Sequence, residues 1–222
     1  MIIAIDGPAG SGKSAVATEL ARVLGAAHLD TGAMYRAVAL EAMRQSVADQ
    51  PHAVTAIAQN VQLEFDFSVD PPAILLNGHD VSQDIRLPDV TRITYCAADN
   101  PDVRAELVKR QRVIAGRLDS VVTEGRDQGT VAFPDADFKF FIDAQPEERA
   151  RRRQLQLQSK GIVESFEQVL NDIVTRDQHD RSRTVGPLMP ALDAIIIDST
   201  ELNLAQVTDT LARLVRAGGK CR

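Results

Sequence analysis

The sequence predicts an α/β protein with a five-stranded parallel sheet, helices on both faces of the sheet, and a small antiparallel β insertion. Short apolar runs alternate with segments of helical periodicity, which is typical of parallel strands joined by crossover helices. A glycine-rich loop follows the first apolar run, and a stretch near residue 61 alternates strictly between apolar and polar residues. At 222 residues, the chain is long enough for one substantial core that carries a small insertion.

Five apolar runs are the expected strands, and ligands of open α/β sheets bind at the carboxyl ends of such strands. The expected strands are Ile2–Asp6, Ala27–Asp30, Ser120–Glu124, Phe138–Asp143 and Ala194–Asp198. Apolar residues at helical spacing predict one helix after the glycine-rich loop and another near the end. They are Val16, Leu20, Val23 and Leu24 in the first case and Leu204, Val207, Leu211, Leu214 and Val215 in the second. Pro101 is expected in the opening turn of a further helix.

The insertion is expected over residues of about 60–86. Val61, Leu63, Phe65, Phe67 and Val69 alternate with polar residues, which predicts a strand with one buried face. The turn pair Asn77-Gly78 then predicts a hairpin between further short antiparallel strands.

Composition excludes several classes of protein. Hydrophobic residues make up 44% and the net charge is −6, so we expect a soluble protein whose main partner is neither a nucleic acid nor a membrane. No signal peptide or membrane span is expected. The only two cysteines, Cys96 and Cys221, lie far apart in the sequence, so we expect no disulfide. These features predict a cytoplasmic location. The four histidines lack metal-ligand spacing. Arginine outnumbers lysine 20 to 5, which reflects either genomic base composition or a need for planar phosphate-binding groups.

The loop GPAGSGKSA, from Gly7 to Ala15, carries the clearest chemistry. It satisfies G-x4-G-K-[ST] between an expected strand and an expected helix, so its backbone N–H groups can enclose phosphate oxygens. Lys13 is expected to reach the β- and γ-phosphates, and Ser14 to ligate Mg²⁺. The sequence lacks the DxxG and NKxD motifs of a switch GTPase.

Three charged segments downstream add a second phosphate-binding region. In EGRDQG, Arg126 can clamp a phosphate and Asp127 can accept a hydrogen bond from a base, although a local salt bridge within a turn would also explain the pair. In residues 147–161, Arg149 shares a helix face with Arg152 and Arg153 but not with Arg151, which indicates either a lid over donor phosphates or a solvated surface.

The segment RDQHDRSR is the third. Arg176 and Asp180 are i, i+4 neighbours, and with Arg181 and Arg183 they form either a sugar- and phosphate-binding site or a surface charge ladder. After the second strand, Thr31 is expected to be a helix N-cap, and Arg36 in the helix can face the acceptor.

Taken together, these segments resemble bacterial-type cytidylate kinases of the P-loop nucleoside monophosphate kinase superfamily over nearly the whole chain. The resemblance is carried by GPAGSGKS, LDTGAMYR, LNGHDVSQDIR, PDVRAELVKRQR, EGRDQGTVAFPDA, the arginine helix and RDQHDRSR. It implies a P-loop core (residues 1–35, 103–145 and 170–222), a CMP-binding domain (36–102) that includes the β insertion, and an arginine lid (146–169). It also implies a monomer that phosphorylates CMP and dCMP with ATP and Mg²⁺.

The resemblance also implies roles for individual residues. Lys13, Arg126, Arg153 and Arg183 would act on the transferring phosphoryl group. The ATP-binding residues would be Gly7, Pro8, Ala9, Gly10, Ser11, Gly12, Lys13, Ser14, Ala15, Arg149 and Arg153. The CMP-binding residues would be Thr31, Arg36, Arg104, Arg126, Asp127, Arg176, Asp180 and Arg183. Asp127 and Arg104 would read cytosine, whose N4 amino group donates a hydrogen bond, whereas O4 of uracil would face the carboxylate as a second acceptor.

Two positions depart from the family pattern. Tyr95 stands where the family usually has Ser, so either Tyr95 or the neighbouring Thr94 provides a base contact, or that contact is lost. Ala15 stands where Thr is common. Two other functions stay open: a kinase for UMP or another small acceptor, and a non-catalytic nucleotide sensor.

Overall fold

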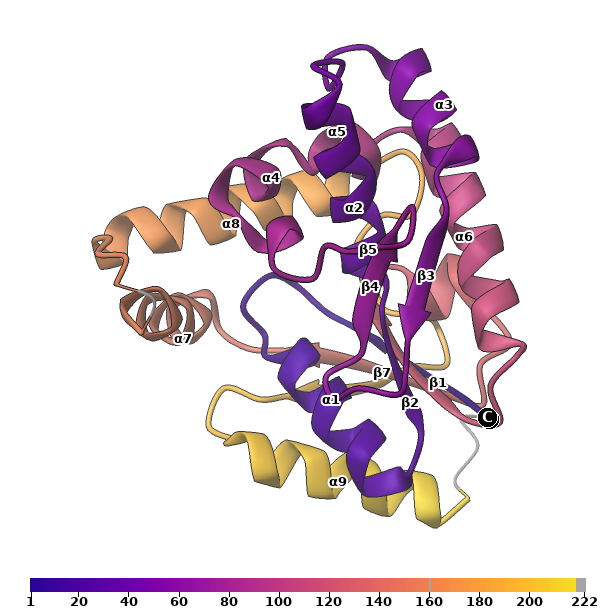
Figure 1. The fold of residues 1–222 in the computed structure, drawn as a ribbon. Coiled ribbons are helices and arrows are strands. Elements are labelled where there is room, and N and C mark those ends of the chain that lie inside the picture. Colours follow the sequence, from indigo (N-terminus) through magenta and orange to yellow (C-terminus); the bar gives the residue numbers. More distant parts are fainter. Residues whose placement is uncertain (160, 219–222) are drawn as a thin grey trace. The chain divides into compact units, whose positions relative to one another are not determined.

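The computed structural model describes residues 1–159 and 161–218 (Figure 1). Backbone contacts divide the chain into two units. The first, called here the core unit, comprises Met1–Ala26 and the chain from Ser120 onward. The second, called the inserted unit, comprises Ala27–Asp119. These bounds differ from the three segments expected from the sequence, because residues 27–35 and 103–119 group with residues 36–102.

The main sheet has the strand order β2-β6-β1-β7-β8. Its strands are β1 (Ile2–Asp6), β2 (Ala27–Asp30), β6 (Val121–Gly125), β7 (Phe138–Asp143) and β8 (Ile195–Asp198). The central strand β1 pairs in parallel with β6, where Asp6 lies opposite Gly125, and with β7 on its other side. The expected parallel five-stranded sheet flanked by helices is therefore confirmed, with the bounds of β6 and β8 shifted by one residue at most.

Helices α1 (Lys13–Leu24) and α9 (Leu204–Arg216) lie side by side along this sheet (Figure 1). Their apolar faces pack on the strands in a single cluster that includes Val16 and Leu20 of α1 and Leu211 of α9. The sequence pattern therefore correctly predicted both helices and most of the faces that they bury, although Leu204 at the start of α9 is exposed.

A second helix pair in the core unit consists of α7 (Pro146–Gln158) and α8 (Phe166–Ser182). Ala150 and Leu157 of α7 pack against Val169 and Ile173 of α8 in a small cluster of their own. Pro146 stands in the first turn of α7, and the Ser165 side chain caps α8 by accepting from the Gln168 N–H group. Helices α7 and α8 carry Arg149, Arg153 and Arg176, three of the arginines expected to bind the nucleotides.

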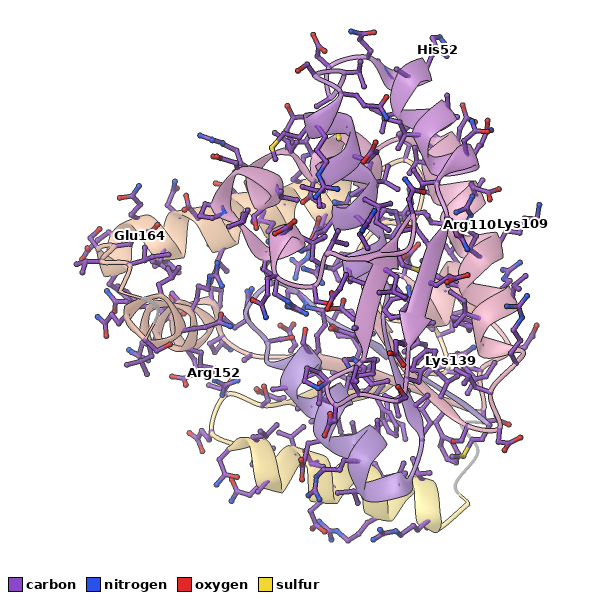
Figure 2. The ribbon with its side chains drawn as sticks, viewed as in Figure 1. His52, Lys109, Arg110, Lys139, Arg152 and Glu164 are labelled. Atoms are coloured by element: carbon purple, nitrogen blue, oxygen red, sulfur yellow. The ribbon has the colours of Figure 1, made fainter. Side chains whose placement is uncertain are left out.

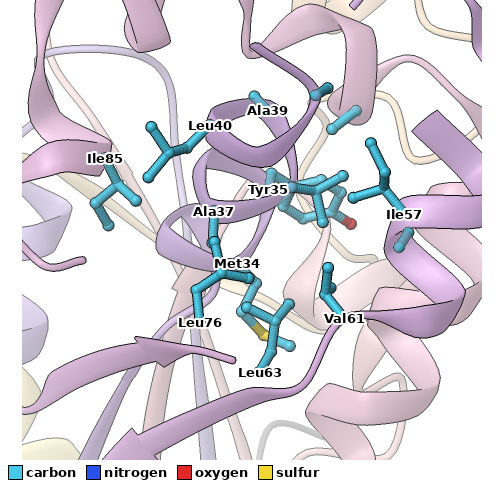
Figure 3. Packing of buried hydrophobic residues seen from close by; sticks show 14 of the residues in the cluster. Met34, Tyr35, Ala37, Ala39, Leu40, Ile57, Val61, Leu63, Leu76 and Ile85 are labelled. Carbon is cyan, nitrogen blue, oxygen red and sulfur yellow. The ribbon is translucent and has the colours of Figure 1, made fainter. Parts of the chain in front are cut away.

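The inserted unit has its own apolar core around α2, in which Met34, Ala37 and Val38 are fully buried (Figure 3). Pro101 opens α6 as expected, and Asn100 caps that helix. The unit contains α2 (Thr31–Arg44), α3 (Pro51–Asn60), β3 (Leu63–Asp66), β4 (Ala73–Leu76), β5 (His79–Asp80), η1 (Asp84–Arg86), α4 (Pro88–Ile93), α5 (Tyr95–Ala98) and α6 (Pro101–Ala115).

The β insertion is a separate antiparallel sheet of β3, β4 and β5. Asn77 and Gly78 both have positive φ, 51° and 80°, so the predicted hairpin turn is confirmed. The expectation that the first strand runs to Val69 is wrong, since β3 ends at Asp66. There the Asp66 carboxylate accepts from the N–H and hydroxyl groups of Ser68, which turns the chain out of the strand.

Cys96 is a free, half-buried thiol, whereas Cys221 lies outside the described residues. None of the described helices combines the length and the apolar character that a membrane span needs.

Candidate functional site

The loop from Gly7 to Gly12 joins β1 to α1 in the core unit. A Cβ atom at Gly7 would lie 2.1 Å from the backbone oxygen of Ile142 in β7, so only glycine lets the loop pass this close to the sheet. Gly12 is the N-cap of α1 and provides no side-chain cap, and no acidic residue occupies the first turn. The N–H groups at this end of the helix are thus oriented to bind an anion.

Lys13 is the first residue of α1 and its side chain is almost completely buried. Its Nζ donates a hydrogen bond of 3.3 Å to the Pro8 oxygen. Burial lowers the pKa of Lys13 to about 7, and the positive charges of Arg126 and Arg176 act in the same direction, while Glu124 and Asp180 oppose them. The ammonium is therefore held in a place where a phosphate would strongly stabilise its charged form.

We expect triphosphate binding to take up a proton above pH 7. In the free protein at pH 8 most Lys13 side chains are neutral, whereas a bound phosphate raises the pKa and restores the ammonium. ATP affinity should consequently fall as the pH rises above 7. Calorimetry of MgATP binding at pH 8 in two buffers of different ionisation enthalpy should give an uptake of nearly one proton. Lys13→Ala is the control and should abolish the uptake; an equal uptake in that variant would contradict the assignment.

Arg126, Asp180 and Arg183 form an ion-pair cluster in the core unit. Arg126 Nε donates to Asp180 Oδ2 at 2.8 Å, and Arg183 Nη2 lies 2.6 Å from Asp180 Oδ1. Burial alone would raise the pKa of Asp180, but Arg126, Arg183 and Arg176 together hold it below its usual value. Arg126 and Asp180 are 54 residues apart, so the structure assembles this cluster from two of the charged segments.

Asp127 is buried two residues after the end of β6. Its backbone oxygen accepts from the N–H groups of Val131 and Ala132, and a π-helical turn, η2 (Gln128–Ala132), follows it. Asp127 and Arg126 therefore stand at the carboxyl end of a strand adjacent to β1, where ligands of such sheets bind.

Arg149 on α7 is buried and contacts the phosphate-binding loop. Its Nη1 donates to the Ala9 oxygen at 2.9 Å and to Asp177 of α8, while its Nε donates to the Ala144 oxygen at 2.8 Å. Asp177 in turn accepts from the Ala9 N–H group at 3.1 Å. The Arg149–Asp177 pair thus forms hydrogen bonds with both the N–H group and the carbonyl oxygen of Ala9.

Asp177→Ala should lower the free energy of unfolding by about 3–5 kcal/mol, because it leaves Arg149 as a buried charge without its carboxylate. Urea denaturation followed by circular dichroism measures this loss. Asp209→Ala, which breaks the exposed Arg213–Asp209 pair on α9, is the matched control and should leave stability almost unchanged. Equal losses in the two variants would contradict the special role of the buried pair.

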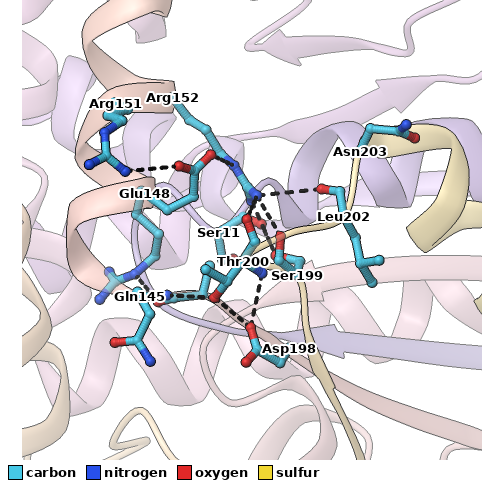
Figure 4. A network of polar contacts seen from close by, with 12 residues as sticks. Ser11, Gln145, Glu148, Arg151, Arg152, Asp198, Ser199, Thr200, Leu202 and Asn203 are labelled. Carbon is cyan, nitrogen blue, oxygen red and sulfur yellow. Dashed lines mark hydrogen bonds and ion pairs between the residues drawn. The ribbon is translucent and has the colours of Figure 1, made fainter.

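The other arginines of α7 have different surroundings. Arg152 (Figure 2) donates to the hydroxyl and backbone oxygens of Ser199 and to the backbone oxygen of Leu202, and also pairs with Glu148 (Figure 4). It thereby ties α7 to the segment between β8 and α9. Arg153 is also partly buried, and it donates to Gln156 at 2.7 Å on the same helix. The shared face predicted for Arg149, Arg152 and Arg153 therefore includes one buried and one partly buried anchor.

Three expected acceptor residues belong to the inserted unit. Arg36 donates to Thr91 Oγ1 at 2.7 Å, and the Arg104 guanidinium lies 5.4 Å from the centre of the Tyr35 ring and donates to the Ala98 oxygen. The expectation that Thr31 caps α2 is wrong: the cap is Asp30, whose carboxylate accepts from the Ala33 N–H group, and Thr31 is the first residue of the helix.

The structure also shows the surroundings of Thr94 and Tyr95, the two residues at the position where the family usually has Ser. The Thr94 hydroxyl donates to the Val90 oxygen at 2.8 Å, one turn earlier in the chain, whereas the Tyr95 side chain is exposed. In the inserted unit, Tyr95 is therefore the more accessible of the two hydroxyl groups.

Sequence reasoning missed three acidic residues of the core unit: Asp6, Glu124 and Asp177. Each is buried, and each contacts or electrostatically influences the loops described above. Asp6 ends β1 and Glu124 is the penultimate residue of β6, so each stands just before a glycine-rich loop, and that position was the available signal. Asp177 lies within a charged helix and gave none.

The expected metal ligand is Ser14 in the first turn of α1. Within residues 1–159 and 161–218, no group of three or more His, Cys, Asp and Glu side chains is arranged to hold a metal ion. The Ser14 hydroxyl is an oxygen donor, the ligand type that Mg²⁺ takes, and Mg²⁺ commonly completes its coordination with phosphate oxygens and water.

Solved structures of low sequence identity share the fold. A shikimate kinase from Bacteroides thetaiotaomicron superposes with a TM-score of 0.50 at 11% identity, covering 97% of this chain and 98% of that chain. An uncharacterised protein from Eubacterium ventriosum gives a TM-score of 0.53 at 14% identity and covers 98% of both chains. At these identities the likeness concerns the fold alone.

Sequence comparison is more specific. The profile of the cytidylate kinase family matches residues 3–217. Cytidylate kinases from Pelotomaculum thermopropionicum and Mycolicibacterium paratuberculosis are 46% and 45% identical to this chain, covering 97% of it and 96% and 95% of themselves. A bifunctional pantoate ligase/cytidylate kinase from Synechococcus sp. (strain JA-3-3Ab) is 48% identical, and this chain spans 40% of its length. The chain therefore belongs to the cytidylate kinase family.

Proposed function

We propose that this chain transfers the γ-phosphoryl group of ATP to CMP and dCMP, which gives CDP and dCDP. Family membership over residues 3–217 supports an enzyme of this class. The observation that carries the proposal is that the core unit holds two positively charged groups suited to phosphate: the loop with Lys13, and the cluster of Arg126, Asp180 and Arg183. A transferase needs both groups, whereas a protein that only binds ATP needs one.

On the acceptor side, Arg126 and Arg183, with Arg36, hold the phosphate of the monophosphate. Arg176 and Asp180 hold its sugar, and Asp127 and Arg104 read cytosine. Asp180 already forms ion pairs with Arg126 and Arg183 in the free protein, which holds both guanidinium groups in place before the acceptor arrives and leaves one net positive charge for its phosphate. Thr31, the first residue of α2, completes the set of acceptor-binding residues that we propose.

On the donor side, the nine residues from Gly7 to Ala15 enclose the phosphates of ATP, and Arg149 and Arg153 act from α7. The buried Arg149 sets the position of Ala9 in the loop, whereas the partly buried Arg153 contacts Gln156 of its own helix and is available to cover the nucleotide. Residues 146–169 accordingly form the arginine lid. The remaining segments form the P-loop core (1–35, 103–145 and 170–222) and the CMP-binding domain (36–102).

Mg²⁺ would be held at this loop by the Ser14 hydroxyl, an oxygen donor in the first turn of α1. When bound, it neutralises charge on the β- and γ-phosphate oxygens. We propose a monomer that acts in the cytoplasm.

In the reaction itself, the protein positions two substrates in line and neutralises charge. Lys13 donates to the phosphoryl group in transfer, and Arg126, Arg153 and Arg183 stabilise the negative charge on its oxygens. No side chain needs to act as a general base, because in-line positioning and charge neutralisation suffice. Closure of the lid excludes water, which would otherwise accept the phosphoryl group.

A substrate panel tests the proposal. ADP release coupled to a spectrophotometric assay should show that CMP and dCMP are phosphorylated faster than UMP and AMP at equal concentrations. If UMP or AMP outpaced CMP, the chain would be a kinase for another acceptor. ATP binding without turnover of any monophosphate would indicate a sensor instead.

A further inference from the structure

Asp6 is the last residue of β1, and its side chain is only 3% exposed. One carboxylate oxygen, Oδ1, accepts from the backbone N–H group of Gln128 at 2.8 Å. The other, Oδ2, accepts from the N–H group of Gly129, also at 2.8 Å. The carboxylate therefore binds two consecutive peptide groups at the start of η2, on a segment more than 120 residues away in sequence.

A second contact fixes the same turn. The Thr123 hydroxyl on β6 donates to Gln128 Oε1 at 2.8 Å. Gly125 leaves room for this arrangement, because a Cβ atom there would lie 2.7 Å from Gln128 Nε2. Arg126 and Asp127 are thus the two residues between the end of β6 and a turn whose backbone and side chain are both held.

The contact with Asp6 has an energetic cost. Burial raises the pKa of Asp6 to about 7, against the two N–H donors and Arg126, which lower it; the nearby charge of Asp127 adds to the rise. At pH 8 the protein thus holds a buried carboxylate where a neutral group would be better tolerated. Such arrangements are typical of residues that fix the geometry of a site at the expense of stability.

We propose that Asp6 is a positioning residue that fixes the directions in which Arg126 and Asp127 present their side chains to the acceptor nucleotide. The inference rests on the acceptor-binding roles proposed above for those two residues. A misplacement of about 1 Å in such a group can cost about 100-fold in rate, so a firm support is expected.

Asp6→Asn tests this role, because the amide replaces one acceptor with a donor that faces a peptide N–H group. We expect the Kd and KM for CMP to rise about 10-fold and the ratio of kcat/KM for CMP over UMP to fall by a similar factor. The Kd for ATP should not rise, and the melting temperature should not fall. Asp137→Asn is the matched control, since Asp137 accepts from the Ile2 N–H group at 2.8 Å at the other end of β1.

The pH dependence of the same ratio provides a second measurement. CMP and UMP carry the same phosphate, so its ionisation cancels in the ratio. In the wild type, the ratio should fall as the pH drops through about 7, where Asp6 becomes protonated and loses one acceptor. Arg126 and Asp127 are the charged neighbours that act on Asp6. In Asp6→Asn the ratio should not vary between pH 6 and 8, and a pH dependence that persists in this variant would overturn the proposal.

Thr123→Val provides an independent test if Asp6→Asn folds poorly. It keeps the volume of the side chain but removes the hydroxyl that holds Gln128, and it should also weaken acceptor binding more than ATP binding. If the wild type prefers a different monophosphate, the proposed base-reading roles fail, and the Kd for that monophosphate then replaces the Kd for CMP in the same comparison. If the acceptor Kd is unchanged in both variants, the positioning role fails alone.

Discussion

Lys13→Ala should lower kcat for CMP phosphorylation by about 1,000-fold, which is the scale for removing a charge that stabilises a transferring phosphoryl group. Lys13 begins α1 beside the phosphate-binding loop, and its Nζ has an oxygen of that loop, from Pro8, within 3.3 Å. Its ammonium gains most when negative charge accumulates on the phosphoryl oxygens, so the loss should appear in kcat more than in the KM for ATP.

The same substitution should leave the melting temperature unchanged or raise it. Burial and the neighbouring Arg126 lower the pKa of Lys13 to about 7, which means that the folded protein disfavours its charged form. Below pH 7 that cost is present in full, and it diminishes as the pH rises toward 10.5, the ordinary pKa of lysine in an unfolded chain. Lys13 is thus retained for catalysis rather than for stability.

Single-turnover kinetics and calorimetry of the same preparation separate the two effects. Lys109→Ala is the control, because Lys109 is exposed on α6 (Figure 2) and should alter neither rate nor stability. A loss of kcat that comes with a marked fall in melting temperature would contradict a purely catalytic role.

Much of this fold follows from the sequence because the core is built by local patterns. Each main-sheet strand is a short apolar run, and α1 and α9 bury most of the residues that recur at helical spacing. The phosphate-binding loop could be recognised because its glycines, lysine and serine are contiguous. The length of β3 could not be derived, since the contacts of Asp66 with Ser68 end the strand within an alternating pattern. The N-cap of α2 is Asp30, one residue before the predicted Thr31. The sequence could not decide between them, because Asp and Thr are both good capping residues.

The partners of the charged residues were less accessible to sequence reasoning. Helical spacing placed Arg149 on a face of α7, but it did not reveal that this face is buried against Ala9 and Asp177. Arg126 was also compatible with a local salt bridge, and only the folded chain brings it to Asp180. Asp6 was part of a strand pattern, and its two hydrogen bonds to a distant turn depend on the pairing of β1 with β6.

Asp127→Ala should reduce the preference for CMP over UMP, measured as the ratio of kcat/KM values, by about 100-fold. Asp127 is a buried carboxylate at the carboxyl end of β6, next to the arginine proposed to hold the acceptor phosphate. The N4 amino group of cytosine donates to such a group, whereas O4 of uracil would leave two acceptors facing each other. Removal of the carboxylate therefore weakens the binding of CMP in the transition state, and it also removes the unfavourable contact that disfavours UMP.

Asp127→Asn distinguishes base reading from a general loss of geometry. The amide oxygen can still accept from N4 of cytosine, and the amide nitrogen can donate to O4 of uracil, so CMP activity should largely survive while UMP activity increases. Asp135→Ala, which alters an exposed carboxylate between η2 and β7, should leave the ratio unchanged. If Asp127→Ala retains the wild-type preference, the base is read elsewhere. If the Ala and Asn variants both lose CMP and UMP activity to the same extent, Asp127 maintains the structure of the loop after β6 and does not select the base.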